Sequence, residues 1–584
     1  MRNFRQLPLL LAAVAGLTPT AGAQIIRNPG AATTNTAGDA STPVEIGRQA
    51  QARFEQLRRE HLPASRSSRP GRCDEQVGRF CYWYDENAPG APLEPKITTD
   101  ARAQLIALLD TLAKQVPDDR WISGQRVRYL AEAERFPEAL AAAKACGVGG
   151  WWCELLVGFS LHLMGEYESA DSAYALALRQ MMPRDRCAWR DLSLLIDDDT
   201  RQQYKRLPCD DPKRAAFEDR VWFLSRTLYQ MHGNDSRTEH YARLTMVMML
   251  QDAPSAHQFG FDDDEKELTL RFGWPRQWSR AGYDPRSRSY SVTGHEPTPA
   301  YRYIPAGFVL GNPSMSDSTN WALQLPPVIG RYAPPYAKVL KPLVHQKAMF
   351  KRGDSALVVV AYDATPMKEM NGTPAYAALI VTPGDAARGY VARAKAAEPT
   401  GVLTVKAPWG PQLMSAEVAA PARNAVARAR YGLQPPYAIG TRVTLSDLLF
   451  YKPYGAFPAT VEEAAPHAHS TERLRADEKL GVYWETYGTD PQGEKMGISL
   501  TVVREVEESG FLRRQAKALK LVREATPVSV SVQDLSARGA EVSPRAIELD
   551  ISTLTKGSYI VQLEIGVAGQ YGIRTDHRIE IISP

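Results

Sequence analysis

The runs ALVVVAYD (356–363), AYAALIVT (375–382) and GVLTVKA (401–407) decide the fold of the second half of the chain. Each run is short, rich in apolar and β-branched residues, and followed by a turn that contains Pro or Gly, which is typical of β-strands. LMSAEVA (413–419) extends the series. Because no crossover helices separate these runs, we expect antiparallel sheets.

Further strand-like runs continue the series toward the C-terminus: MGISLTVVREV (496–506), PVSVSVQDL (527–535), AIELDI (546–551) and SYIVQLEIGV (558–567). In the last two runs, apolar residues alternate with polar ones, so each strand has one buried and one exposed face. This pattern favours sheets that pack over a core on one side only.

The series is interrupted twice, at 423–433 and at 464–480. These breaks divide the strand-rich half into two parts, each long enough to fold around its own core. We therefore predict two antiparallel β-sandwich domains, at 341–460 and 475–584.

The first half of the chain has a helical period instead. In ARAQLIALLDTLAKQV (101–116) and WCELLVGFSLHL (152–163), apolar residues recur at positions i, i+3 and i+4. Pro and Gly mark the joints between such segments. We predict a helical region over 46–207, and the fold class is a multidomain α+β protein.

Part of the helical region resembles a tetratricopeptide repeat. The small and aromatic positions of that repeat correspond to Gly158, Gly165, Tyr167, Ala170, Tyr174, Ala177 and Leu178. A weaker copy precedes it, with Phe136 and Ala139 in the places of Tyr167 and Ala170. Two repeats are fewer than the ~3 that a self-standing solenoid needs, so we expect other bonds to stabilise this stack.

The cysteines all lie in the first half of the chain. They form three sequential couples: Cys73 and Cys81, Cys146 and Cys153, and Cys187 and Cys209. An even number of cysteines in an exported chain predicts disulfides. Pairing within each couple closes the shortest loops at the least entropic cost, and we predict that pairing. The C-x-x-C spacing of a zinc knuckle is absent.

The N-terminus has the three parts of a secretory signal peptide over residues 1–23. Arg2 and Arg5 precede an apolar core, and Ala21-Gly22-Ala23 supplies a cleavage site. Residues 24–45 contain few large apolar residues and are expected to form a flexible leader. We predict export to the periplasm or the medium.

Charge and hydropathy exclude two classes of partner. The formal net charge is +4, and loss of Arg2 and Arg5 with the signal leaves about +2. A nucleic-acid-binding protein would carry a strongly basic domain, so we expect no nucleic-acid partner. No segment after the signal approaches the ~18 apolar residues of a membrane span, so we expect no transmembrane segment in the mature chain.

After Cys209, the sequence predicts a small module over 208–280. Two helical segments flank a polar break at Gly233-Asn234-Asp235, and Leu268 and Leu270 alternate with polar residues as in a short strand. Gly273-Trp274-Pro275 then ends that segment. Residues 281–340, which are rich in Pro, Tyr and Ser, are predicted to form an irregular linker.

This module resembles the bacterial GWxTD-domain proteins. The residues that carry the resemblance are Gly233, Asn234, Asp235, Arg237, Glu239, His240, Arg243, Arg271, Gly273, Trp274 and Pro275, although the GWxTD pentapeptide itself is absent. Leu445–Leu449, Tyr483–Tyr487 and Leu554–Tyr559 resemble the β-rich half that often follows this domain. The resemblance implies an architecture and no catalytic residue.

The most suggestive polar cluster is His232, Glu239 and His240. Two imidazoles and a carboxylate could bind a metal, but neither H-E-x-x-H nor H-x-x-E-H is present. We favour a structural hypothesis, in which Asp235 or Ser236 caps a helix and Glu239 completes a capping box. A metal-dependent enzyme or envelope hydrolase built on this cluster stays the alternative.

Other chemistry is not supported by the motifs. The chain has no G-x-S-x-G nucleophile elbow and no phosphate-binding loop, so we predict no catalytic residue and no cofactor. The aromatic clusters Tyr82-Trp83-Tyr84 and Trp151-Trp152 could bind a cell-wall glycan, but packing against the neighbouring disulfides is favoured. The sequence as a whole predicts an exported, non-catalytic protein that binds another envelope or secreted protein.

Overall fold

A computed structural model describes most of the chain. The described residues are 41–65, 73–85, 90–257, 260–284, 289–323, 328–385, 389–435, 443–490, 492–505, 528–535, 541–567, 569 and 572–582. The predicted signal peptide and residues 24–40 of the predicted leader lie outside them. The first helix begins at Pro43, so the last three residues of the predicted leader are helical.

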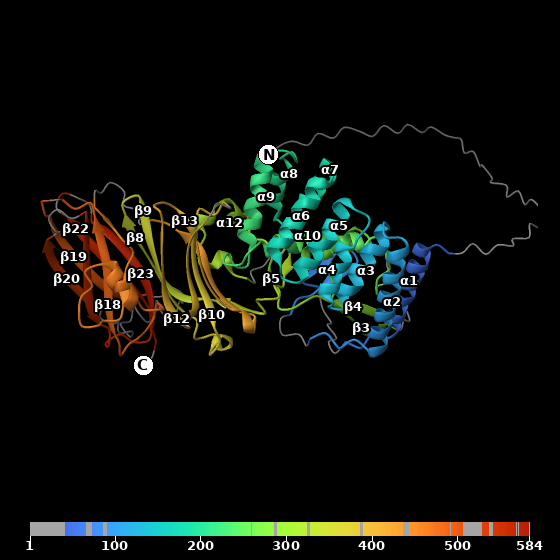
Figure 1. The fold of residues 1–584 in the computed structure, drawn as a ribbon. Helices are drawn as coiled ribbons and strands as arrows, with labels where there is room; N and C mark the ends of the chain where they lie inside the picture. The colour runs from blue at the N-terminus through green and yellow to red at the C-terminus, as the bar shows by residue number, and fades with distance from the viewer. Residues whose placement is uncertain are drawn as a thin grey trace, which may run out of the picture. The chain divides into compact units, whose positions relative to one another are not determined.

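The N-terminal part is helical, as the sequence predicts. Its helices are α1 (Pro43–Glu60), α2 (Lys96–Gln115), α3 (Arg120–Glu132), α4 (Phe136–Lys144), α5 (Gly150–Leu163), α6 (Tyr167–Gln180), α7 (Pro183–Arg190), α8 (Asp198–Lys205), α9 (Pro212–Ser225), α10 (Asp235–Leu250) and α11 (Asp263–Phe272). Helices α3, α5 and α10 lie side by side (Figure 1). Buried Leu109, Phe159, Tyr174 and Met246 belong to the apolar core that joins them.

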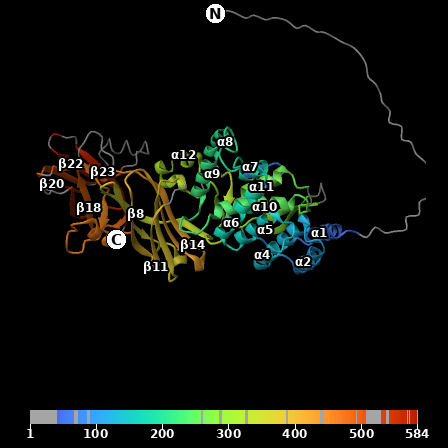
Figure 2. The ribbon, with the colours of Figure 1, turned by 45° about the horizontal axis from the view of Figure 1, so that its top comes forward.

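The repeat-like residues lie at the contact between α5 and α6, which are adjacent in the structure (Figure 2). Tyr174 is buried, and its ring would meet a Cβ added at Gly158 at 2.9 Å. A small residue at position 158 therefore lets the two helices approach each other.

Helix α11 differs from the sequence-based prediction of a short strand at Leu268 and Leu270. The segment is helical over Asp263–Phe272 and buries Thr269, Leu270 and Phe272. Asp263, Asp264 and Glu265 lie in its first turn, where negative charge is favoured by the helix dipole. The alternation of Leu and polar residues here is too short to distinguish the period of a strand from that of a helix.

The three disulfides pair the cysteines in sequence order, as their spacing predicts. The bonds are Cys73–Cys81, Cys146–Cys153 and Cys187–Cys209. The first lies at the hairpin of β1 (Glu75–Val77) and β2 (Phe80–Tyr82). The second joins the end of α4 to α5, and the third joins α7 to the segment after α8.

The predicted irregular linker, 281–340, contains several regular elements. Strands β3 (Gln277–Asp284) and β4 (Ser289–His295) form a hairpin, and β5 (Tyr301–Arg302) pairs with β6 (Arg331–Tyr332). Short helices lie between β5 and β6: α12 (Gly307–Gly311), η1 (Pro313–Met315) and η2 (Ser318–Trp321). These elements pack against the helices and against the next sheet through one core that includes Leu192, Trp222, Tyr303 and Ile380.

The next part of the chain forms two sheets around one core. The first sheet has the order β11-β10-β13-β14-β7 and the second the order β12-β9-β8. Their strands are β7 (Val339–Pro342), β8 (Val344–Arg352), β9 (Ser355–Asp363), β10 (Ala375–Thr382), β11 (Tyr390–Ala397), β12 (Thr400–Pro408), β13 (Gln412–Ala420) and β14 (Ala425–Leu433). Val358, Val360 and Leu379 lie in the shared core. The predicted interruption at 423–433 is mostly strand β14, because Ala, Val and Leu alternate there with Arg.

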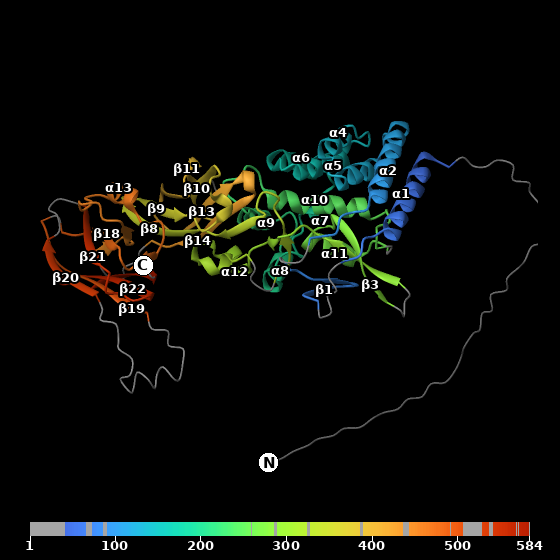
Figure 3. The same ribbon diagram turned by 90° about the horizontal axis from the view of Figure 1, so that it is seen from below.

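The C-terminal part forms two more sheets (Figure 3). One has the order β15-β18-β16, with β21 also paired to β18, and the other has the order β17-β23-β22-β19-β20. Their strands are β15 (Thr444–Leu445), β16 (Leu449–Tyr451), β17 (Arg473–Arg475), β18 (Lys479–Tyr487), β19 (Lys495–Arg504), β20 (Val528–Leu535), β21 (Val542–Asp550), β22 (Gly557–Val567) and β23 (Ile573–Ile582). The short elements α13 (Val461–Ala464), η5 (Ala465–His467) and, earlier, η3 (Lys368–Met370) and η4 (Pro421–Arg423) lie in connections.

The boundary between the two strand-rich parts differs from the predicted one. Strands β15 and β16 pair with β18, so residues 444–451 belong to the C-terminal sheets and not to the range 341–460. Leu445 and Phe450 lie in the same core as Trp484 and Leu563. The architecture is thus mixed α+β, with helices first and strand-rich sheets after them. In the described part of the chain, no helix combines the length and apolar character that crossing a membrane requires.

Candidate functional site

Most of the motif residues singled out in the sequence gather around helix α10. The helix begins at Asp235, and its cap is Asn234, whose side-chain oxygen accepts a hydrogen bond from the backbone N–H of Arg237 (3.0 Å). Asn234 also donates to the carbonyl of Trp222 (2.9 Å). The predicted caps, Asp235 and Ser236, bind elsewhere: Asp235 accepts from the Tyr336 hydroxyl, and Ser236 donates to the carbonyl of Ser225.

Gly233 allows the chain to enter α10 next to α6. Its φ is +76°, and an added Cβ would lie 2.4 Å from the backbone nitrogen of Glu168. Both the left-handed conformation and the close backbone approach require glycine. Arg237 forms an ion pair with Asp171 of α6 (2.9 Å), which fixes the same contact from the other side.

Glu239 is a buried carboxylate with two partners. It accepts from His162 Nε2 (2.7 Å) and from Arg243 Nε (2.7 Å), so it is not part of a capping box. Burial raises the pKa of Glu239, but the charge of Arg243 and the hydrogen bond from His162 outweigh it and hold the pKa well below its usual range. Glu239 is therefore ionised and neutralised within the core.

Arg243 connects α10 to the end of α11 and to β6. Its guanidinium donates to the carbonyls of Leu270 (3.0 Å) and Arg331 (2.7 Å) and lies over the ring of Tyr303. Gly273 lies beside this guanidinium and has a φ of +96°, a conformation that other residues rarely adopt. The saturated network points to a structural role.

The remaining residues of the GWxTD-like motif lie at the end of α11. Arg271 donates to Glu267 and Glu75 (2.9 Å each), and Trp274 is buried beside Phe159. Pro275 lies against Gly294 of β4. These residues thus join the helices to the β1–β2 and β3–β4 hairpins.

The alternative metal cluster does not come together. His232 is exposed, whereas Glu239 and His240 are buried and point to different neighbours. His240 packs against Trp222, with ring centroids 5.1 Å apart, and burial lowers its pKa to about 3. Within the described ranges, no group of three or more His, Cys, Asp or Glu side chains has the arrangement of a metal site.

The aromatic clusters pack within the protein. Tyr82 is buried and stacks on Phe272 at 3.8 Å, and Trp152 is buried and donates to Ser123 Oγ (3.1 Å). The guanidinium of Arg120 lies over the rings of both Trp151 and Trp152. The partners of these rings are thus a phenylalanine of α11 and a serine and an arginine of α3.

A groove lies beside α10, between the segment after α7 and the start of α11. Its volume is about 820 Å³. Apolar side chains line it, and those that are partly exposed are Leu194, Leu244, Met248 and Phe261. Among the described residues, the acidic side chains that line it are Asp191, Asp262, Asp263 and Asp264, and the cation that lines it is Lys266. Arg79 pairs with both Asp264 (2.7 Å) and Asp262 (3.2 Å), and Asp262 and Asp263 are exposed.

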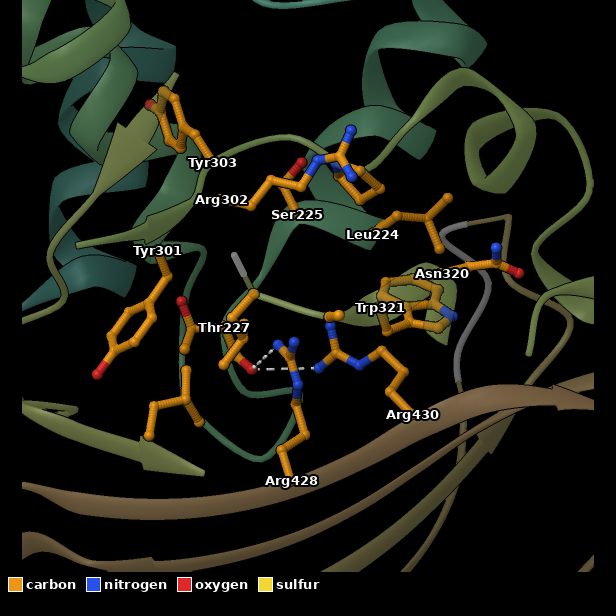
Figure 4. Close-up of a pocket in the computed structure, with 14 residues that line it drawn as sticks. Leu224, Ser225, Thr227, Tyr301, Arg302, Tyr303, Asn320, Trp321, Arg428 and Arg430 are labelled. Carbon is orange, nitrogen blue, oxygen red and sulfur yellow. Dashed lines mark hydrogen bonds between the residues drawn. The ribbon is translucent and has the colours of Figure 1, made fainter. Parts of the chain in front are cut away.

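A second cavity lies where α9, the β5–β6 segment and strand β14 meet (Figure 4). Arg302, Arg428 and Arg430 line it together with Tyr301, Tyr303 and Trp321. No motif in the sequence singles out these arginines. Arg428 and Arg430 alternate with other residues and so lie on one face of 425–433, but the residues that they contact are distant in sequence.

Comparison with known proteins adds little to this geometry. No family model matches the chain, and no curated protein matches it. Among solved structures, the chain is similar to transglutaminase of the red sea bream, with 11% identity over 41% of this chain and 31% of that one, at a TM-score of 0.14. A likeness at that level carries no argument about fold or function.

Proposed function

We propose that this chain is an exported, non-catalytic protein that holds a segment of another envelope or secreted polypeptide. The helical part would be a short tetratricopeptide-like stack within a GWxTD-like architecture, and the strand-rich part a pair of β-sandwiches. Three disulfides support an oxidising compartment, because such bonds persist outside the cytoplasm. The partner site would be the groove beside α10.

The groove carries this proposal. Its floor presents Leu244 and Met248, which are four residues apart on one face of α10, to the outside. Apolar side chains in a groove receive the apolar anchors of an amphipathic helix that binds there. The long, flexible side chain of Met248 can adapt to the shape of a bound segment.

Charge selects the class of partner. Asp263 lies exposed at one edge of the groove beside Asp262, which pairs with Arg79, and the exposed Asp191 also lines the groove. Opposite charges across an interface increase the rate of encounter and favour one partner over others. The partner segment is therefore expected to combine apolar residues with Lys or Arg.

Two designed peptides test the proposal. The first is a labelled 15-residue peptide with Leu at i, i+3, i+4 and i+7 and Lys at the other charged positions, and the second has Glu in place of Lys. We expect fluorescence anisotropy to show binding of the Lys peptide that weakens with salt and is at least about tenfold tighter than that of the Glu peptide.

Variants then locate the binding site. Met248→Asp and the pair Asp262→Lys, Asp263→Lys should each weaken binding of the Lys peptide about tenfold. Asp118→Lys makes the charge change of one of these two Asp→Lys substitutions at an exposed turn between α2 and α3 and should bind as the wild type does. Equal affinity for both peptides, or wild-type affinity in Met248→Asp, would contradict the proposal.

A further inference from the structure

The arginine-lined cavity contains more cationic than anionic groups. Arg428 and Arg430 are two residues apart on β14, so both side chains leave the same face of the strand. Both donate to the carbonyl of Thr227, Arg428 at 2.9 Å and Arg430 at 3.3 Å (Figure 4). Arg302 lines the other side of the cavity. Their guanidinium groups therefore share one small, partly enclosed space.

Arg430 is fully compensated by its surroundings. It forms an ion pair with the buried Glu417 (3.1 Å) and donates to the carbonyl of Arg226 (2.8 Å). Its guanidinium also lies 3.7 Å above the ring of Tyr229 and 5.3 Å from that of Trp321. These contacts offset the cost of burying its charge.

Glu417 accepts hydrogen bonds from several other donors. Besides Arg430, its carboxylate accepts from the backbone N–H groups of Tyr229 (2.8 Å) and Gln230 (3.0 Å) and from the hydroxyl of Ser415 (2.7 Å). A carboxylate accepts about four such bonds, and Glu417 accepts four, three at Oε1 and one at Oε2.

Arg428 is compensated less fully than Arg430, because the charge of Glu417 acts on it without an ion pair among the described residues. The guanidinium of Arg428 donates to the Thr227 carbonyl. Burial and the neighbouring charge of Arg430 lower the pKa of Arg428 to about 9. Arg302 donates to the carbonyl of Ile304 (3.1 Å), and burial lowers its pKa as well, although Asp197 partly opposes this.

We propose that this cavity binds a carboxylate group, with Arg428 as its principal ion-pair partner and Arg302 as a second source of positive charge. A guanidinium presents paired N–H donors that match the two oxygens of a carboxylate. This proposal is independent of the groove, because the two sites share no residue.

Size favours a carboxylate over a larger oxyanion. The cavity volume is about 40 Å³. A water molecule needs roughly 10–15 Å³ measured in this way, so the cavity holds about three water-sized groups. A carboxylate has three heavy atoms, whereas a phosphate has five. The aromatic side chains of Tyr301, Tyr303 and Trp321 line the cavity beside the arginines.

Titration calorimetry and thermal unfolding of the whole mature protein test this site with acetate as the probe. Acetate at 100 mM, compared with chloride at the same ionic strength, should raise the unfolding temperature of the wild type by about 2–4 °C. Arg428→Gln should lose this increase, with at least a tenfold weaker affinity for acetate. Arg393→Gln removes an exposed arginine from β11 and should keep the full effect.

A purely structural role for Arg428 predicts the opposite result in anion-free buffer. Removal of an incompletely compensated charge beside Arg430 should leave the unfolding temperature unchanged or raise it, whereas loss of a structural arginine would lower it. An equal effect of acetate on the wild type and on Arg428→Gln, or tighter binding of phosphate than of acetate, would overturn the proposal.

Two further measurements complete the test. Acetyl-Ala-Asp-Ala-amide presents the same group on a peptide; its binding would point to a polypeptide ligand, and binding of acetate alone to a free small acid. If Arg428→Gln does not fold, crystals of the wild type soaked in 100 mM acetate should show density for a carboxylate beside Arg428 that crystals soaked in chloride lack. Absence of that density would also overturn the proposal.

Discussion

At the scale of single residues, the protein buries charged groups in its helical core and compensates them unequally. Glu239 has two charged or polar partners and is ionised. Glu265 is also buried, but one of its carboxylate oxygens has no hydrogen-bond partner within the described ranges. Burial raises the pKa of Glu265 to about 7, although Arg128 and Arg79 oppose the shift. Glu239 thus stays ionised and paired, whereas the charge of Glu265 changes near neutral pH.

Glu265 should make the stability of the helical part fall as the pH rises. Its pKa is higher in the folded protein than in the unfolded chain, so the folded state binds the proton more tightly. The favourable contribution is complete below the unfolded pKa of 4.5 and is lost as the pH rises through about 7. Glu265→Gln should therefore stabilise the protein by about 2 kcal/mol at pH 8 and leave it nearly unchanged at pH 4.5.

Urea unfolding followed by circular dichroism at both pH values checks this expectation. Glu166→Gln, which removes an exposed carboxylate at the start of α6, is the matched control and should change neither value. A stabilisation of Glu265→Gln that is the same at both pH values would show that Glu265 does not titrate in this range.

At the scale of elements, helix α10 organises the N-terminal part. It contacts α3, α5, α6, α9 and α11 and has few exposed residues. Its position depends on the turn at Gly233 and on the cap at Asn234, both of which precede its first residue. A change at the cap is thus transmitted to every helix that packs against α10.

Asn234→Ala should destabilise the helical part by about 1–2 kcal/mol. The substitution leaves the backbone N–H of Arg237 without its cap and the carbonyl of Trp222 without its donor. Asn234→Asp keeps the cap and should recover part of the loss. The comparison is made by urea unfolding, with Asn371→Ala at an exposed position as the control. Wild-type stability in Asn234→Ala would mean that the helix start is held by packing alone.

At the scale of the whole molecule, the two strand-rich parts are joined by a shared apolar core. Phe350 and Val359 of the first part pack with Leu449, Tyr451 and Tyr483 of the second. Polar contacts cross the same junction: Arg352 donates to Glu485 (2.6 and 2.9 Å), and Lys347 pairs with Asp447 (2.7 Å). Such a junction makes separate folding of either part costly.

A fragment of residues 475–584 alone should therefore fail to unfold cooperatively. It lacks β15 and β16, and with them the buried side chains of Leu445, Leu449 and Phe450. The loss of several buried large side chains costs about 2–5 kcal/mol each, which exceeds the stability of a small domain. A fragment of residues 339–584 should unfold more cooperatively than 475–584, although it lacks the core that Ile380 and Leu413 share with Leu192 and Trp222.

The two fragments are compared by urea unfolding with fluorescence and by amide proton dispersion in NMR spectra. Cooperative unfolding and dispersed spectra of 475–584 would show instead that this range is an independently folding domain. The shared core would then contribute little to its free energy of unfolding.

The sequence by itself determined the features that depend on neighbours along the chain: the order of helices and strands, and the disulfide pairing across short loops. Hydrophobic period and loop closure are local quantities, so they can be read from the chain directly. The predictions for α11 and β14 were wrong. Both segments are short, and over so few residues the alternation of apolar and polar side chains does not distinguish a helix from a strand or a loop.

Only the tertiary structure decided which distant residues meet. Glu239 binds His162 of another helix, and Arg428 lies beside Thr227 from the end of α9. No local pattern encodes these contacts, because they result from how the faces of helices and sheets pack to fill space. The groove and the arginine-lined cavity arise at such contacts between distant segments, and so the candidate sites of this protein follow from its packing rather than from its motifs.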